Sequence, residues 1–330
     1  MSGLQLNRKR PRAESSDFAS QPKGELRRDD EYWFEDGNII IVAQEVGFRV
    51  YKGLLAMKSE VFRDMFSLPQ PAPNPGSSRG ETSECPIVHV TDTAAEIRLL
   101  LASHLTSAEF VSASHTFDDI ANGVRMGHKY GNPTLLKYSL ERLERYYPAD
   151  PSKWDRLGQD PYGDPHAIVA VILARLANTQ SVLTPALYAC CQLDGKTLVE
   201  GRVRLDGIVD MLSPEDLVRC IDGKARLWSY LMETVDEAFR PIRTVPCPDT
   251  DGRCDHSFAL MRREWMSSTR RVGGACNVLR PWKTDIQALV DTHQYPLCRF
   301  CTEMLYLRAE SIRKRSLSKL AQQLGVDAEP

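Results

Sequence analysis

Residues 36–66 change their hydrophobic period abruptly, and this change limits the fold more than any other feature of the sequence. The run IIIV at 39–42 is β-branched and apolar, which is typical of a buried strand. The stretch FRVYK at 48–52 alternates in character, so residues 38–52 are predicted to form a hairpin whose turn is longer than two residues. Apolar residues recur at helical spacing over 53–69. The sequence therefore predicts an α+β fold in this region.

Capping residues mark where the helices of this region begin. Ser59 is the predicted N-cap of the helix that carries the Phe-rich face of residues 53–69. Residues 86–90 (PIVHV) predict a further strand, and Thr116 with Asp119 has the spacing of a capping box. The sequence GNP at 131–133 then separates two helical patterns. Helix, Gly-x-Pro and helix together predict a tight helical hairpin.

The second half of the chain is predicted to be mostly helical. Residues 165–179 form a buried apolar helix pattern, and residues 213–239 form the clearest helix in the chain. Ser213 is the expected cap of that helix, with Pro214 in its first turn and Gly223 as an expected interruption. Because no repeat period is evident, a solenoid is not expected.

Composition and charge narrow the function classes. The net charge of −2 gives no global attraction to nucleic acid or to an anionic membrane, and no apolar run approaches the ~18 residues that span a bilayer. The N-terminus lacks the apolar core of a secretory signal, so an intracellular location in the nucleus or cytoplasm is expected. The nine cysteines are then expected to be free thiols or metal ligands. The basic C-terminal stretch 308–319 is expected to be a solvated helix face, and nucleic acid is not an expected partner.

Two segments have the composition of loops or tails. Residues 1–30 are polar and charged and predict a disordered basic tail. The cluster RKRPR at 8–12 has the character of a nuclear import signal, although a solvated tail has the same composition. Residues 70–85 are rich in Pro, Gly and Ser and predict an exposed loop.

These elements and their residues resemble a BTB/POZ domain over about residues 31–147. Residues 36–66 resemble its opening, with an Asp before the first strand and LLAMKSEVFRDMF after the second. Residues 87–105 resemble its third strand and following helix, and residues 119–143 resemble its end, where an aromatic-containing helix meets a Gly-x-Pro break. The resemblance implies a small mixed sheet flanked by helices, as a BTB/POZ domain at 31–148. A mostly α-helical domain at 149–330 would follow.

The resemblance implies a non-enzymatic protein-interaction module, a scaffold or adaptor that forms a homo-oligomer through its BTB region. Common enzyme motifs are missing, so we predict no catalytic and no cofactor-binding residues, although a dispersed catalytic site is not detectable in a sequence. One alternative is a substrate adaptor of a cullin ubiquitin ligase. Cullin binding in the family often involves an apolar-x-Glu element after the helix that follows the third strand. Here Ala108-Glu109 only partly matches that element, and the family's Tyr-Thr-Gly turn is missing. The other is a nuclear transcription-associated regulator, which rests on residues 8–12 and the basic C-terminus.

Four cysteines of the second half have a spacing that suits a metal. The C-terminal region resembles that of fungal BTB proteins with a cysteine pair about seven apart and a later LCxxC element. Cys247 with Cys254, and Cys298 with Cys301, occupy these positions, and His256 is the alternative ligand. Four thiolates suit a structural zinc ion, which binds sulfur in a tetrahedron. The competing interpretation is a set of ordinary buried thiols, because free cysteine packs like a small hydrophobic residue.

Overall fold

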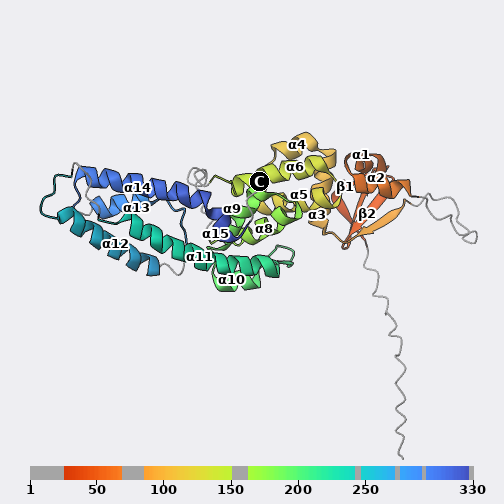
Figure 1. Cartoon of the computed structure of the whole chain (residues 1–330). Coiled ribbons are helices and arrows are strands. Elements are labelled where there is room, and N and C mark those ends of the chain that lie inside the picture. The colour runs from red at the N-terminus through yellow and green to blue at the C-terminus, as the bar shows by residue number, and fades with distance from the viewer. Residues whose placement is uncertain are drawn as a thin grey trace, which may run out of the picture. The chain divides into compact units, whose positions relative to one another are not determined.

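The structure is a computed structural model, and its elements are shown in Figure 1. The basic cluster at 8–12 and nearly all of the loop predicted at 70–85 lie outside the residues it describes. Within the described part of the chain, every helix is too short or too polar to cross a bilayer. The described residues are 26–68, 85–150, 163–241, 247–271, 276–291 and 295–326.

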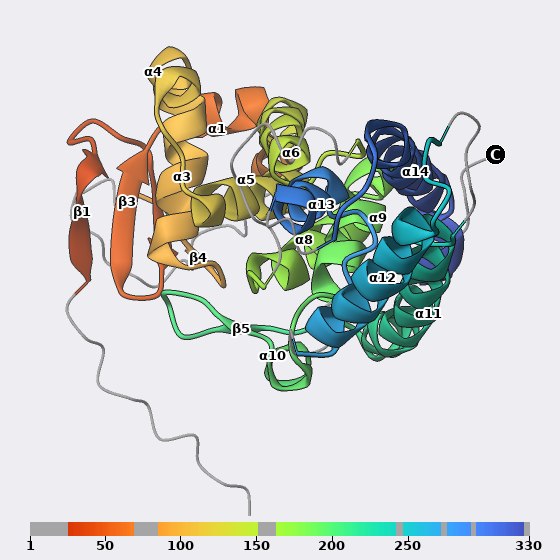
Figure 2. The ribbon, with the colours of Figure 1, turned by 90° about the vertical axis from the view of Figure 1, so that its left-hand side faces the viewer.

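Four strands form one mixed sheet, which confirms the predicted α+β class with a small mixed sheet. β2 and β3 are antiparallel, whereas β1 pairs in parallel with β3 and β4 pairs in parallel with β2. The sheet order is therefore β1-β3-β2-β4, and Figure 2 shows β1 beside β3. The strands are β1 (Arg27–Trp33), β2 (Ile39–Ala43), β3 (Val46–Val50) and β4 (Ile87–Val90).

Strand β1 begins inside the segment 1–30 that the composition predicts to be a tail, so the predicted boundary at residue 30 is corrected. Strand pairing uses backbone groups that polar residues also carry, and Arg27 aligns with Val46 of β3. Tyr32 and Asp29 are buried, and the Asp29 Oδ1 accepts a hydrogen bond from the Tyr32 N–H at 2.9 Å. A polar composition therefore hides a strand that is anchored by two buried side chains.

The β2–β3 hairpin is tighter than its sequence indicates. Only Gln44 and Glu45 separate the two strands, so the prediction of a turn longer than two residues is wrong. Gln44 adopts a positive φ of 55°, a backbone conformation that residues other than Gly rarely take. Strand pairing from Ala43–Val46 onward holds it there, because both strands are buried at nearly every position and their pairing is continuous.

Two short helices, α1 (Lys52–Lys58) and α2 (Glu60–Ser67), follow the hairpin. Ser59 is the N-cap of α2 as predicted, because its Oγ accepts a hydrogen bond from the Phe62 N–H at 3.1 Å. The same hydroxyl donates to the carbonyl of Tyr130, so the cap also joins α2 to the end of a later helix. Phe62 stacks on Tyr130 with ring centroids 4.9 Å apart.

The helical hairpin predicted around GNP is confirmed. Thr116 and Asp119 form the predicted capping box, and Asn132 caps the next helix, whose first residue is Pro133. Gly131 has a φ of +59°, which lets the chain reverse between the two helices. The helices of this region are α3 (Ala94–Leu105), α4 (Ser107–Ser112), α5 (Phe117–Lys129) and α6 (Pro133–Tyr146).

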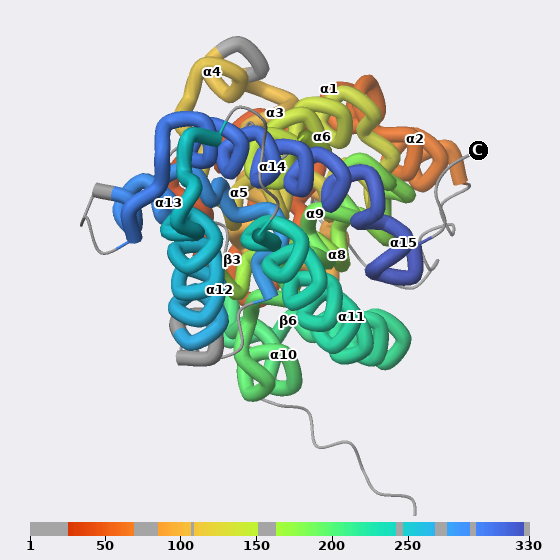
Figure 3. The backbone as a smooth tube through the Cα atoms, turned by 60° about the vertical axis from the view of Figure 1, so that its left-hand side comes forward, coloured from red at the N-terminus to blue at the C-terminus, as the bar shows by residue number. Residues whose placement is uncertain are grey.

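The C-terminal half is almost entirely helical, as predicted, and its long helices α11, α12 and α14 are seen in Figure 3. Ser213 caps α11 through the Asp216 N–H. Gly223 does not interrupt this helix. A Cβ there would lie 3.1 Å from the Cys191 Sγ, so the glycine permits close packing. The remaining helices are α8 (His166–Leu176), α9 (Gln180–Cys190), α10 (Gly195–Glu200), α11 (Pro214–Ala238), α12 (Arg253–Arg271), α13 (Trp282–Asp291), α14 (Arg299–Ser318) and α15 (Leu320–Leu324).

A short hairpin that the sequence did not predict lies between α10 and α11. Its strands are β5 (Arg202–Val203) and β6 (Val209–Asp210). Asp210 is 5% exposed and accepts hydrogen bonds from two guanidinium groups, those of Arg125 at 3.0 Å and Arg204 at 2.8 and 2.9 Å. The Arg202 Nη1 lies 2.7 Å from the Asp118 Oδ1. Buried, paired charges therefore fix the hairpin to α5.

The contacts divide the described residues into two compact units. The first contains residues 26–51 and 85–94, and the second contains the rest of the described chain from residue 52 onward. Within the second unit one hydrophobic core runs from α5 to α15. Leu143 and Tyr147 share this core with Ala167 and later residues, so the boundary predicted between 148 and 149 does not coincide with a division between the units. The BTB/POZ identity of residues 31–148 stays a prediction.

The close approach of α5 to α6 gives a test of this packing. A Cβ on Gly127 would lie 2.7 Å from the backbone N of Leu136 and 2.8 Å from its Cα. We expect Gly127→Ala to lower the free energy of unfolding by about 1–3 kcal/mol, because the clash is with backbone. Gly53→Ala in α1 is the matched control, since a Cβ there meets nothing within 4 Å. Denaturant unfolding measures both, and equal effects would contradict the packing.

The ion pair of Asp118 predicts an acid-dependent stability. The hydrogen bond from Arg202 holds the pKa of Asp118 below its usual value, against the opposing effect of burial. Because the pKa of Asp118 is lower in the folded than in the unfolded state, its ionised carboxylate stabilises the fold at pH values above about 3.9, the unfolded-state pKa. This stabilisation is lost as the pH falls through the folded-state pKa. Asp118→Asn should therefore destabilise at about pH 7 and match the wild type progressively better toward about pH 3. A difference in unfolding free energy that is constant with pH would contradict this.

Candidate metal centre

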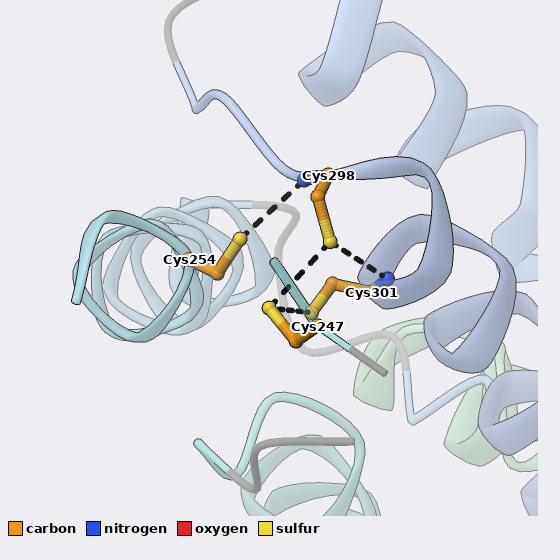
Figure 4. Close-up of side chains that lie close together, drawn as sticks. All are labelled: Cys247, Cys254, Cys298 and Cys301. Atoms are coloured by element: carbon orange, nitrogen blue, oxygen red, sulfur yellow. Dashed lines mark hydrogen bonds between the residues drawn. The ribbon is translucent and has the colours of Figure 1, made fainter. Parts of the chain in front are cut away.

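Three separate segments bring the four predicted cysteines together. Cys247 lies in the segment before α12, Cys254 lies in the first turn of α12, and Cys298 and Cys301 lie at the beginning of α14. Their four sulfur atoms are all within 4.8 Å of one another. Figure 4 shows the side chains gathered in one small space between α12, α14 and the segment of Cys247. These four residues are called the cysteine cluster below.

The distances between sulfurs fit a tetrahedral metal site. The Cys247 Sγ lies 3.6 Å from the Cys298 Sγ and 3.6 Å from the Cys301 Sγ. A disulfide would require a separation of about 2.05 Å, so these contacts are not covalent bonds. A zinc ion bound to four sulfurs at about 2.3 Å has sulfur–sulfur edges of about 3.8 Å. The cluster is therefore the right size to hold a metal ion.

The beginning of α14 explains how two of the ligands are positioned. Cys298 is the N-cap of α14, with φ −71° and ψ 158°, and its Sγ accepts a hydrogen bond from the Cys301 N–H at 3.5 Å. The Cys298 N–H in turn points at the Cys254 Sγ at 3.4 Å. Free N–H groups at a helix N-terminus favour negative charge, so this arrangement stabilises thiolates. The two-residue spacing of LCRFC thus places both sulfurs on one side of the first turn.

The segment CPDTDGRC places the other two ligands. The Asp249 Oδ2 accepts a hydrogen bond from the Cys254 N–H at 2.7 Å, and its Oδ1 accepts one from the Asp251 N–H at 3.3 Å. Gly252 has a φ of 76°, which a turn at this point requires. Cys254 consequently lies in the first turn of α12.

His256, the alternative ligand, is not a member of the cluster. It lies two residues after Cys254 on α12, which is about 200° around the helix axis. Its side chain is therefore exposed, while that of Cys254 is buried. Only an extended loop would have allowed His256 to reach the sulfurs.

The environment of the cluster affects its four thiols differently. Burial raises the pKa of Cys254 to about 11 and also raises the pKa of Cys301. Burial acts in the same direction on Cys298, but the hydrogen bond from the Cys301 N–H and the contacts with the three other thiols outweigh it. The pKa of Cys298 is consequently below the ordinary value. Cys298 therefore ionises more readily than Cys254 and Cys301.

The other cysteines lie outside the cysteine cluster. Cys190, Cys191, Cys220 and Cys276 are buried, and the Cys276 Sγ donates a hydrogen bond to the Cys191 carbonyl at 3.3 Å. Cys85 is partly buried. Across the described ranges, the cysteine cluster is the one group of metal-ligand side chains close enough to share an ion. The mutual proximity of its four sulfurs therefore distinguishes the cysteine cluster from the other cysteines.

Comparison with known proteins adds no identification. No family model matches the sequence, and comparison with curated proteins and with solved structures found no match. The resemblance to BTB/POZ domains accordingly rests on the residues quoted above. The α+β fold and the cysteine cluster rest on the structure.

The geometry predicts which substitutions abolish metal binding. We expect the purified protein to bind one Co²⁺ ion per chain with the strong thiolate-to-metal absorption of a tetrahedral cobalt–cysteine site. Cys254→Ser should remove most of this absorption, because it removes one of the four sulfurs. His256→Ala is the matched control on the same helix and should leave the spectrum unchanged. Loss of the spectrum in the histidine variant would contradict the ligand set.

Proposed function

We propose that the cysteine cluster holds a structural zinc ion. The observation that carries this proposal is the mutual proximity of four sulfurs from three segments, all within 4.8 Å. Zinc is a good match for an all-sulfur set, and a site with four protein ligands keeps no position open for a substrate. The ion would therefore stabilise the fold and take no part in catalysis.

The zinc ion would act as a clamp between parts of the chain that are distant in sequence. Cys247 and Cys301 are 54 residues apart, and the ion joins the segment before α12 to the first turn of α14. Ser257 supports the same junction, because its Oγ donates a hydrogen bond to the Pro296 carbonyl at 2.9 Å. Metal ligands that are brought together only by folding make metal binding part of the folding free energy.

The clamp predicts a measurable zinc content. The purified protein should contain about one zinc per chain by elemental mass spectrometry, and Cys298→Ser should contain much less. Removing the metal should lower the midpoint of thermal unfolding by roughly 5–15 °C, which corresponds to a loss of a few kcal/mol. Cys220→Ser, which alters a packing thiol, is the control and should retain zinc. A wild-type protein without zinc would exclude the site.

For the whole chain, we propose a non-enzymatic scaffold that binds other proteins and forms a homo-oligomer through residues 31–148. The resemblance to BTB/POZ domains supports it, as does the surface of α1 and α2. There Met57 is 63% exposed, Val61 is 44% exposed, and Leu68 follows at 64%. Exposed apolar side chains that recur on consecutive helices are typical of protein contacts. The nucleus and the cytoplasm both fit this role.

The α1–α2 surface can be tested directly. We expect the full chain to be an oligomer by light scattering coupled to size exclusion, and Met57→Asp with Val61→Asp to reduce its mass by about half or more. The two introduced aspartates would place charged carboxylates without a partner inside that interface, which disfavours association. Val111→Asp, at an equally exposed position on α4, is the control. An unchanged mass in the α1–α2 variant would reject this surface.

A further inference from the structure

The region between α10 and α11 exposes an unusual amount of apolar surface. Large exposed hydrophobic side chains are scattered singly over most of the described chain, but here they concentrate within 23 residues. Six of them are more than half exposed: Val199, Val203, Leu205, Met211, Val218 and Ile221. A concentration of this kind, rather than single exposed residues, marks an interaction site.

In the β5–β6 hairpin charged side chains are buried and apolar side chains are exposed, which is the reverse of an ordinary surface hairpin. Arg202, Arg204 and Asp210 face inward, and their side chains are 14%, 17% and 5% exposed. Val203, which lies between Arg202 and Arg204, faces outward and is 65% exposed, because alternate residues of a strand point to opposite faces. Leu205 lies in the turn that follows β5 and is 96% exposed.

The hairpin is also rigid. Asp210 is held between Arg125 and Arg204, and Arg204 also lies 3.6 Å from the Glu96 carboxylate. Gly201, which precedes β5, has a φ of +79°, and a Cβ there would lie 2.4 Å from the Asp210 carbonyl oxygen. Because the exposed tip is fixed in advance, docking it would cost little conformational entropy.

The two helices that flank the hairpin in the sequence, α10 and α11, line an apolar groove. It has a volume of about 650 Å³ and lies between α10 and α11, which are labelled in Figure 1. Leu198, Leu217, Ile221 and Trp228 supply apolar walls, and Lys224 is the one charged residue that lines it. The Lys224 Nζ donates a hydrogen bond to the Leu193 carbonyl, which holds the charge at the groove.

The tip of the hairpin has the complementary composition. Leu205 is almost fully exposed, and the next residue, Asp206, is an exposed carboxylate. The Asp206 Oδ1 accepts a hydrogen bond from the Ile208 N–H at 3.0 Å, so the tip is ordered. The groove offers apolar walls and one cation, and the tip offers an apolar side chain and one anion. Opposite charges beside an apolar contact fix both the register and the orientation of a docked partner.

We propose that a second copy of this chain docks here, with the hairpin tip of each copy in the α10–α11 groove of the other. Leu205 enters between the apolar walls, and Asp206 pairs with Lys224 of the second chain. Such an exchange is self-complementary, because each chain supplies one tip and one groove, as a two-fold interface requires. This surface is separate from α1 and α2, and the inference does not rest on the proposed oligomerisation through residues 31–148.

The contact predicts a specific covalent crosslink. A carbodiimide joins a carboxylate directly to an amine that touches it, so Asp206 should become linked to Lys224. An equal mixture of ¹⁴N and ¹⁵N full-length chains, analysed by mass spectrometry after proteolysis, shows whether the link joins two copies. We expect mixed-isotope peptides that connect Asp206 to Lys224. The protein carrying Met57→Asp and Val61→Asp is tested in parallel, so that association through α1 and α2 cannot account for the result.

Substitutions test the same contact without the crosslinker. Leu205→Asp should weaken self-association at least about tenfold in sedimentation velocity, as expected for the loss of a central apolar anchor. Asp206→Lys and Lys224→Glu should each weaken it, and the two together should restore it. Leu307→Asp is the matched control, because Leu307 is 68% exposed on α14, far along the sequence from this surface.

Three outcomes would overturn the inference. The first is the absence of any link between copies at Asp206 and Lys224. The second is self-association that Leu205→Asp and Leu307→Asp weaken equally. The third is a double charge exchange that behaves no better than the single substitutions. Leu205 and Asp206 are exposed, so substitutions there leave the fold intact, and circular dichroism verifies this for each variant.

Discussion

The sulfur of Cys247 lies 3.6 Å from two sulfurs at the beginning of α14, and this contact joins parts of the chain that are distant in sequence. Residues 247–252 and 295–298, which precede α12 and α14, form no helix or strand, and such segments do not by themselves fix the direction of the helices that follow. The cysteine cluster supplies that constraint at the first turn of each helix. The packing of Phe239, Trp265 and Trp282 between α11, α12 and α13 then has a defined geometry, with ring centroids 5.1–6.5 Å apart.

Polar interactions also hold the β5–β6 hairpin in place. In most small hairpins apolar side chains point into the protein and hold the element in place, whereas here a buried carboxylate between two arginines does so. Breaking a buried pair of this kind leaves an uncompensated charge, so its geometry is strongly maintained. The apolar residues of the hairpin are thereby released for contact with another molecule. The alternation that buries the charges exposes Val203, and the turn between the strands exposes Leu205.

Local signals in the sequence predicted the fold well, and features that depend on tertiary contacts escaped it. Ser59 and Thr116 were identified because a cap acts within three residues of its own position. Cys298 and Cys301 were found through their local Cys-x-x-Cys spacing, whereas Cys247 and Cys254 were assigned through the resemblance of the C-terminal region. Strand β1 was hidden because its composition is polar, and β5 and β6 because two-residue strands have no detectable period. His256 lies outside the cluster because α12 already begins at Arg253, and the sequence did not show that this helix turns the side chain away from the sulfurs.

The metal centre and the α10–α11 groove are connected through α11. This helix of 25 residues contributes Leu217, Ile221 and Trp228 to the groove, and it also packs against α9, α12, α14 and α15. The cysteine cluster joins the first turns of α12 and α14. α11 therefore packs against helices that begin at the cysteine cluster and also supplies a wall of the groove. A groove wall that is held in place before docking loses less entropy when a partner binds.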